Sequence, residues 1–156
     1  MLTGQIGLVT DKRHWMGRAI LRITGWTYHH TIIATSDSMC ISAEPGGVRR
    51  RLISDYTNII WSNYAMTEKQ AHHVAGIAEH SIGIRYDYLA CAAHAIAAIT
   101  RVDTPERVQR WLAGRAPTTC SALAQVAVNA AGLRTPRGPL PTPNDWHLHF
   151  QTRGWV

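Results

Sequence analysis

A cysteine that opens a predicted helix is the residue of this sequence with the clearest chemistry. Cys120 follows a proline and two threonines at positions 117–119, which are typical of a helix start, and Gly132 marks the end of that helix. A thiol at a helix N-terminus lies at the positive end of the helix dipole, which favours the nucleophilic thiolate. The alternative is a half-buried cysteine with a structural role only.

A candidate base lies upstream of this cysteine. His29 and His30 precede the apolar run Thr31–Ala34, which predicts a short strand. A strand directs successive side chains to opposite faces, so only one of the two histidines can face the cysteine. A thiol nucleophile and an imidazole base are the two groups needed for acyl transfer through a covalent intermediate.

Six short motifs follow one another along the chain. They are Gly4–Leu8, Tyr28–Ile32, Ser42–Val48, Tyr86–Tyr88, Thr119–Leu123 and Thr142–Asp145. Their order and spacing resemble the circularly permuted branch of the NlpC-type papain-like fold. Within that branch the chain is most similar to the YiiX-like group, which is related in fold to lecithin:retinol acyltransferase. The resemblance implies a histidine strand that precedes the cysteine helix, with Cys120 as nucleophile.

The resemblance also implies the base and the group that orients it. His30 directly precedes the apolar strand, as the histidine of the family does, and is therefore the expected base. The family usually has a glutamate directly before an alanine of the second strand, where this chain has Ser42, with Glu44 two residues further on. A hairpin that turns about Asp37 would place Glu44 opposite His30, and we expect Glu44 to orient the imidazole. A register shifted by one residue would leave Ser42 or a backbone carbonyl in that role.

The remaining pattern predicts one α+β domain over residues 1–156, an antiparallel sheet with packed helices, which the resemblance identifies as a permuted papain-like fold. Strands are expected at residues 5–10, 31–34, 39–43, 48–53 and 59–65, and helices at 12–24, from 67 to near 83, at 88–99, from 104 to 111 and from 120 to near 132. Tyr88–Ile99 is apolar on nearly all sides, which predicts a buried helix. From Leu133 onward, four prolines predict an extended tail.

The charge of the chain indicates a basic surface. Lysine and arginine number 16 against 10 aspartate and glutamate, giving a net charge of +6, and all but two of the basic residues are arginine. Arginine binds carboxylates and phosphates well. No nucleic-acid-binding signature accompanies the charge, so we interpret it as a solvated basic face and expect no specific nucleic-acid partner.

Other classes of site are not expected. The nine histidines lack the spacing of a metal site, so we expect no metal and no cofactor. The three cysteines, at wide spacing, predict free thiols. No apolar run approaches the roughly 20 residues of a spanning helix. No signal peptide is evident, which favours a cytoplasmic or phage-associated protein.

These features predict a cysteine-dependent hydrolase that forms an acyl-enzyme. The resemblance implies an amide bond in a peptide or a peptidoglycan stem as the substrate. One alternative is a lipid-directed acyltransferase or thioesterase, which the apolar segment Tyr88–Ile99 and the basic face would suit. Another is a catalytically inactive binding module, which the missing glutamate at Ser42 would permit.

Overall fold

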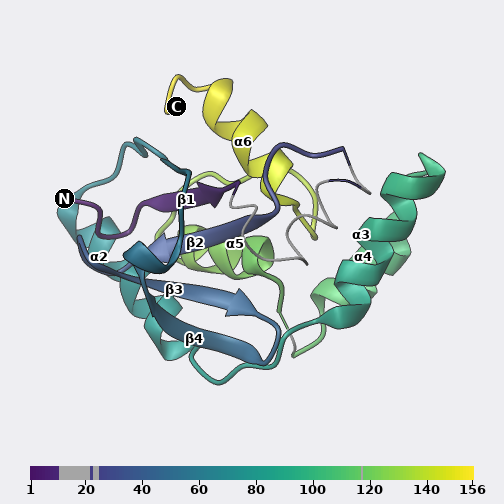
Figure 1. The fold of residues 1–156 in the computed structure, drawn as a ribbon, viewed down its shortest axis with the longest axis horizontal. Helices are drawn as coiled ribbons and strands as arrows, with labels where there is room; N and C mark the ends of the chain where they lie inside the picture. The colour runs from purple at the N-terminus through teal and green to yellow at the C-terminus, as the bar shows by residue number, and fades with distance from the viewer. Residues whose placement is uncertain (11–21, 23–24, 117) are drawn as a thin grey trace.

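The computed structural model describes residues 1–10, 22, 25–116 and 118–156 (Figure 1). The helix predicted at residues 12–24 lies almost entirely outside this part of the chain. The described residues form an α+β domain in which an antiparallel sheet of five strands packs against helices, as predicted. The strands are β1 (Ile6–Val9), β2 (His30–Ala34), β3 (Met39–Glu44), β4 (Gly47–Leu52) and β5 (Ile59–Trp61), and the helices are α2 (Glu68–His80), α3 (Tyr88–Thr100), α4 (Glu106–Ala113), α5 (Cys120–Ala130) and α6 (Pro143–Gln151).

The sheet has the order β4-β3-β2-β1-β5, so the strand that begins with His30 lies at its centre. In the β2–β3 pair, Ile33 lies opposite Ile41, and the pairing ends at Ile32 opposite Ser42. This register corresponds to a hairpin that turns about Asp37, the first of the two registers considered from the sequence.

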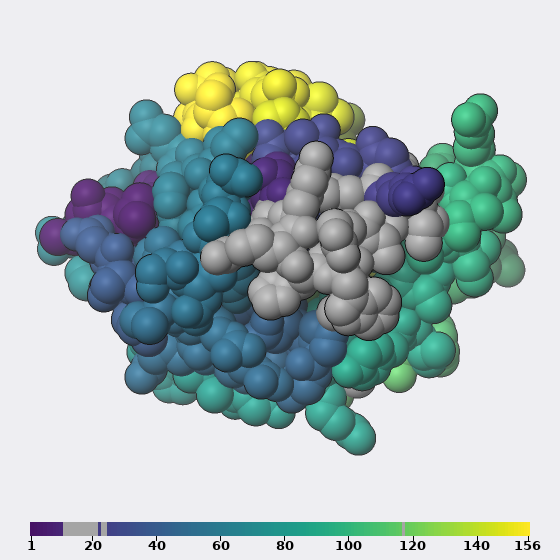
Figure 2. Space-filling view, in the orientation of Figure 1, coloured from purple at the N-terminus to yellow at the C-terminus, as the bar shows by residue number. Residues whose placement is uncertain are grey.

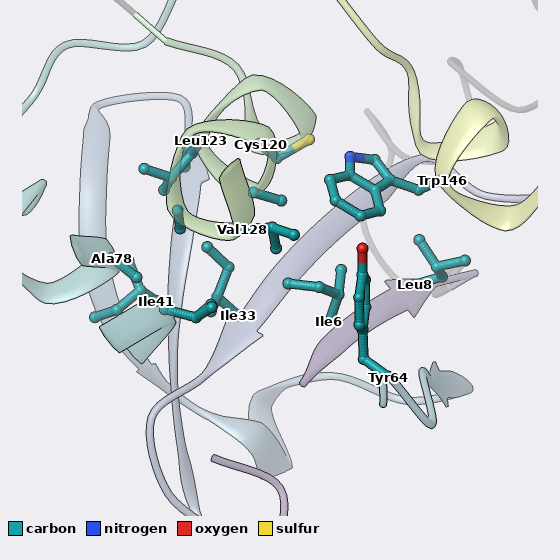
Figure 3. Close-up of a cluster of buried hydrophobic side chains, with 14 of the residues drawn as sticks. Ile6, Leu8, Ile33, Ile41, Tyr64, Ala78, Cys120, Leu123, Val128 and Trp146 are labelled. Carbon is teal, nitrogen blue, oxygen red and sulfur yellow. The ribbon is translucent and has the colours of Figure 1, made fainter. Parts of the chain in front are cut away.

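The two faces of the sheet carry different clusters. Ile33 and Ile41 belong to the main hydrophobic core, which also contains the buried side of α5 and the first residue of that helix. Figure 3 shows these side chains pointing toward one another from the strands and from α5. The alternate residues Ile32 and Cys40 belong to a second, smaller cluster, against which Tyr56 packs. Side chains on β2 therefore alternate between the α5 side and the Tyr56 side.

The C-terminal region differs from the predicted extended tail. It contains α6, which opens with Pro143 and is capped by Thr142 and Asp145: the Thr142 hydroxyl accepts from the Asp145 N–H, and the carboxylate accepts from the Thr142 N–H. This pattern is a capping box with proline at the first helical position, a signal that was present in the sequence. The helix buries Trp146 and Phe150 completely in the main core. The prolines before Pro143 are compatible with an extended segment, but they do not prevent a helix from starting there.

The prediction of a buried helix at Tyr88–Ile99 is wrong. The helix forms, as α3, but Ala90 is its only buried residue. Ala90 packs with Leu112 of α4 and with Leu140. Figures 1 and 2 show α3 and α4 side by side, standing out from the edge of the domain. Within the described residues, no helix has the length and apolar character needed to cross a bilayer.

Candidate functional site

Cys120 is the first residue of α5, and that helix start is anchored on the sheet. The Thr119 hydroxyl caps the helix by accepting from the Ala122 N–H at 3.3 Å. The next residue, Ser121, is tied to β2 by a hydrogen bond of 3.0 Å between its hydroxyl and that of Thr31. The indole N–H of Trp146 donates to the Ser121 carbonyl at 3.1 Å. Sheet, α5 and α6 therefore fix the position of the cysteine together.

The Cys120 thiol is buried, with an exposed fraction of 7%. Burial raises the pKa of Cys120, while backbone N–H groups of Thr31, Ser121 and Cys120 itself and the Ser121 hydroxyl lower it. The net direction is upward, because burial has the largest effect. The helix terminus by itself favoured a thiolate, but the resting form in this environment is the neutral thiol, which needs a base to remove its proton.

His30 opens β2 and is held by one short hydrogen bond. Its Nε2 atom lies 2.7 Å from the hydroxyl oxygen of Ser42, a residue with no exposed surface. Its ring centroid is 6.0 Å from that of Tyr56. Burial, and after it the neighbouring His29, lowers the pKa of His30 to about 3. The imidazole is therefore neutral at neutral pH and able to accept a proton.

Glu44, the expected orienting group, contacts two arginines of β4 rather than His30. Its carboxylate accepts a hydrogen bond from the Arg51 guanidinium and lies 3.6 Å from Nε of Arg49. The observed register, continued by two residues, would place Glu44 opposite His30, but the imidazole bonds instead to Ser42, its diagonal neighbour on β3. The hydrogen-bond partner of the imidazole in the structure is therefore Ser42, the residue that the sequence left as the alternative to Glu44.

Cys120 and His30 approach the same end of β2 from different sides. His30 lies with Ser42 and Tyr56, whereas Cys120 belongs to the main core on the α5 side. No hydrogen bond joins the thiol to the imidazole among the residues that the structure describes. Their link is Thr31, which directly follows His30 and whose backbone N–H acts on the Cys120 sulfur. The β2–β3 pairing ends one residue short of Thr31, so its N–H has no partner in the β3 pairing.

Tyr86 is a further group at this site, to which the sequence had given no role. An isolated bridge pairs it with Thr118, and the Thr118 carbonyl accepts from the Asp87 N–H at 3.0 Å, just before the cysteine helix. The Cys91 thiol donates to the Tyr86 hydroxyl at 3.0 Å. Burial raises the pKa of Tyr86, and Cys120 and Cys91 raise it further. The phenol is therefore protonated, and its own proton is available as a donor.

Asp87 joins this segment to α3. Its buried carboxylate caps α3 by accepting from the N–H groups of Leu89 and Ala90, both at 3.0 Å, and it pairs with Arg115 at 3.2 Å. Nearby, the Thr118 N–H donates to the Arg85 carbonyl at 3.0 Å. The start of α3 and the residues before the cysteine helix are thus one hydrogen-bonded unit.

A second partly buried histidine, His94, lies on α3. Its Nε2 atom is buried with no hydrogen-bond partner among the described residues. It lines a cavity of about 450 Å³ between α3 and the start of α6, together with Arg101 and Asp145. Two further hollows, one along residues 85–89 and one between α4 and α5, are also lined by residues other than Cys120 and His30.

Comparisons of the chain with protein-family models, with curated proteins and with solved structures found no match.

The lowered pKa of His30 has a consequence for stability. The group is harder to protonate in the folded protein than in the unfolded chain, so folding is favoured above a pH of about 6.5 and this contribution is lost as the pH falls toward 3. The free energy of unfolding should decrease over this window by up to about 1.4 kcal/mol per pH unit because of this one residue. His30→Gln keeps a side chain that can hydrogen-bond to Ser42 but cannot titrate. In this variant, the plot of the free energy of unfolding against pH should be flatter between pH 6.5 and 3.

Urea denaturation at a series of pH values from 7 to 4 would measure this effect. His72→Gln is the matched control, because His72 is an exposed histidine on α2. Its curve should run parallel to that of the unchanged protein. If the curve of His30→Gln were also parallel to that of the unchanged protein, the inference that the His30 imidazole is held neutral by burial would be wrong.

Proposed function

We propose that the protein is a cysteine-dependent hydrolase of the permuted papain-like class that cleaves an amide bond through an acyl-enzyme on Cys120. The observation that carries the proposal is the position of Cys120 at the capped start of α5, where Ser121 bonds to Thr31 of the strand that begins with His30. Backbone N–H groups at a helix start stabilise negative charge that develops at the reacting atoms.

The proposed reaction begins with both groups neutral. With Nε2–H donated to Ser42, Nδ1 is the ring atom left to accept the thiol proton, and the step requires the His30 ring, which rests on the Tyr56 side of β2, to turn toward the thiol on the α5 side. The sulfur attacks the amide carbonyl, the C–N bond breaks, and the imidazolium gives its proton to the leaving amine. Water, deprotonated by the same imidazole, then attacks the thioester, releases the acid and returns the proton to the sulfur.

The substrate we favour is a peptide or a peptidoglycan stem, following the sequence resemblance. A second candidate is a lipid-directed acyltransferase or thioesterase that uses the same nucleophile. The exposed apolar side of α3 favours this second candidate, because such a surface suits an enzyme that works where lipid is present.

Trapping the acyl-enzyme would test the proposal. The protein would be incubated separately with cell-wall peptides and with acyl-lipid esters, and hydrolysis and intact mass would both be followed. We expect turnover with one class and a mass increase equal to its acyl group, both lost in Cys120→Ala and kept in Cys91→Ala. Absence of hydrolysis and of any adduct with either class would favour the inactive binding module.

Thiol reactivity gives a second test. Burial raises the pKa of Cys40 to about 12 and that of Cys91 to about 11. Only Cys120 opens a helix, where backbone N–H groups lower the pKa of the thiol against the effect of burial, so iodoacetamide should alkylate it fastest at neutral pH. Peptide mapping after brief labelling would measure the three rates. Because Cys91 is the most exposed of the three thiols, preferential labelling of Cys91 would show that exposure alone governs reactivity here.

A further inference from the structure

The outward side of the α3–α4 pair carries large apolar side chains that are mostly exposed to solvent. The exposed fractions of Ile96, Ile99 and Trp111 are 61%, 64% and 60%. We call this set the α3–α4 apolar surface, and it consists of Tyr88, Leu89, Ile96, Ile99, Val102, Val108 and Trp111. Figure 2 shows α3 and α4 projecting at one edge of the molecule, where such side chains are open to solvent.

The apolar residues of α3 lie on one side of the helix. Leu89, Ile96 and Ile99 follow the spacing that places side chains along a single helical stripe. The opposite side of α3 is turned inward, where His94 and Ala97 line the cavity near α6. The stripe therefore points away from the domain and leaves the hydrophobic cores intact.

The helix α4 continues this surface. The guanidinium of Arg115 lies 5.2 Å from the ring centroid of Trp111. The same arginine lines a surface hollow together with Tyr88 and Leu89. Trp111 and the first turn of α3 are thus neighbours across Arg115. Tryptophan has an apolar body and a polar N–H and is favoured where water meets lipid.

Charged residues border the apolar side chains: residues 101–110 contain three arginines against Asp103 and Glu106, a local excess of one positive charge. Arg101 and Arg107 are exposed, and neither takes part in an ion pair among the residues that the structure describes; Arg101, at the end of α3, also lines the cavity near α6. Arg110 is paired with Glu106, at 2.6 Å, and contributes little net charge. The chain as a whole carries a net charge of +6. An anionic surface would be attracted to this region, and its attraction would weaken with added salt.

We propose that the α3–α4 apolar surface binds the face of an anionic lipid bilayer, with its apolar residues in the acyl boundary and Arg101 and Arg107 at the headgroups. A second copy of the chain fits less well, because two molecules of net charge +6 repel each other. The stripe is also short, since α3 has 13 residues, fewer than two full heptads. This binding does not depend on the chemistry at Cys120.

Co-sedimentation with vesicles tests the proposal. Vesicles of phosphatidylcholine alone would be compared with vesicles that contain about a third phosphatidylglycerol, at low and high salt. We expect the protein to bind the anionic vesicles at least tenfold more strongly, and the double variant Ile96→Asp with Ile99→Asp to lose this binding. Arg101→Gln with Arg107→Gln should weaken it severalfold and reduce its dependence on salt.

Leu148→Asp is the matched control, because Leu148 is an apolar residue of α6 whose exposed fraction is 60%. It should bind like the unchanged protein, and so should Cys120→Ala, which separates lipid binding from the proposed hydrolysis. Thermal melting would verify that each variant is folded. Equal binding by the Ile96/Ile99 variant, or no binding to either vesicle, would overturn the proposal. The proposal would also be overturned if sedimentation velocity showed a dimer that the Ile96/Ile99 variant abolishes, and no binding to vesicles were detected.

Discussion

His30→Ala should reduce turnover by about two to four orders of magnitude, because it removes the proposed base for a thiol that is neutral at rest. His29→Ala is the matched control and should have a much smaller effect. Burial keeps the pKa of His30 low, so the imidazole is already in its accepting form at neutral pH. Steady-state rates across a range of pH values, with the substrate identified by acyl-enzyme trapping, would measure both variants.

The two candidate orienting residues should differ as well. Ser42→Ala removes the hydrogen bond to Nε2 and should cost more turnover than Glu44→Gln, whose partners are Arg51 and Arg49. The ranking expected is therefore His30→Ala, then Ser42→Ala, then Glu44→Gln. A larger loss for His29→Ala than for His30→Ala would refute the assignment of the base.

Cys120→Ser should abolish turnover and leave the thermal midpoint almost unchanged. The substitution keeps the size of the side chain, and the backbone N–H groups near the sulfur give the new hydroxyl hydrogen-bond donors. The alcohol is a far weaker nucleophile than the thiol under the same base. Circular dichroism melting and the hydrolysis assay would be run on the same preparation, with Cys91→Ser as the control for the loss of a thiol.

A different result would change the interpretation of the cysteine. A hydroxyl forced into an apolar niche without partners costs about 1–3 kcal/mol, which would lower the melting temperature by several degrees. Such a fall in Cys120→Ser, with no matching change in activity, would indicate a structural role in the core.

The sheet was the part of the fold that could be predicted most fully. The alternation of apolar residues and the turn residues around Asp37 left two registers for the β2–β3 pair, and the observed one is the register preferred from the sequence. The register did not determine which residue of β3 the long side chain of His30 would contact. An imidazole can reach a diagonal neighbour as well as the residue opposite, so His30 meets Ser42 while Glu44 is held by arginines.

Burial was harder to predict from local pattern. The apolar segment of α3 predicted a core helix, but composition cannot distinguish a helix covered by protein from one whose apolar side remains open. The same limit applied to Cys120. Its place at a helix start was evident from the sequence, while the opposing effect of burial on its pKa depends on the three-dimensional packing of α5 against the sheet.

The hydrogen-bonded unit around Asp87 has a mechanical consequence. Asp87 holds the first turn of α3 and the Arg115 side chain, and its backbone N–H is bonded to Thr118, two residues before the cysteine. The far end of the α3–α4 pair has no comparable attachment to the sheet among the described residues. The α3–α4 pair is therefore attached to the domain beside Cys120. A force on the outer end of the pair would be transmitted to residues 118–120 through these backbone hydrogen bonds.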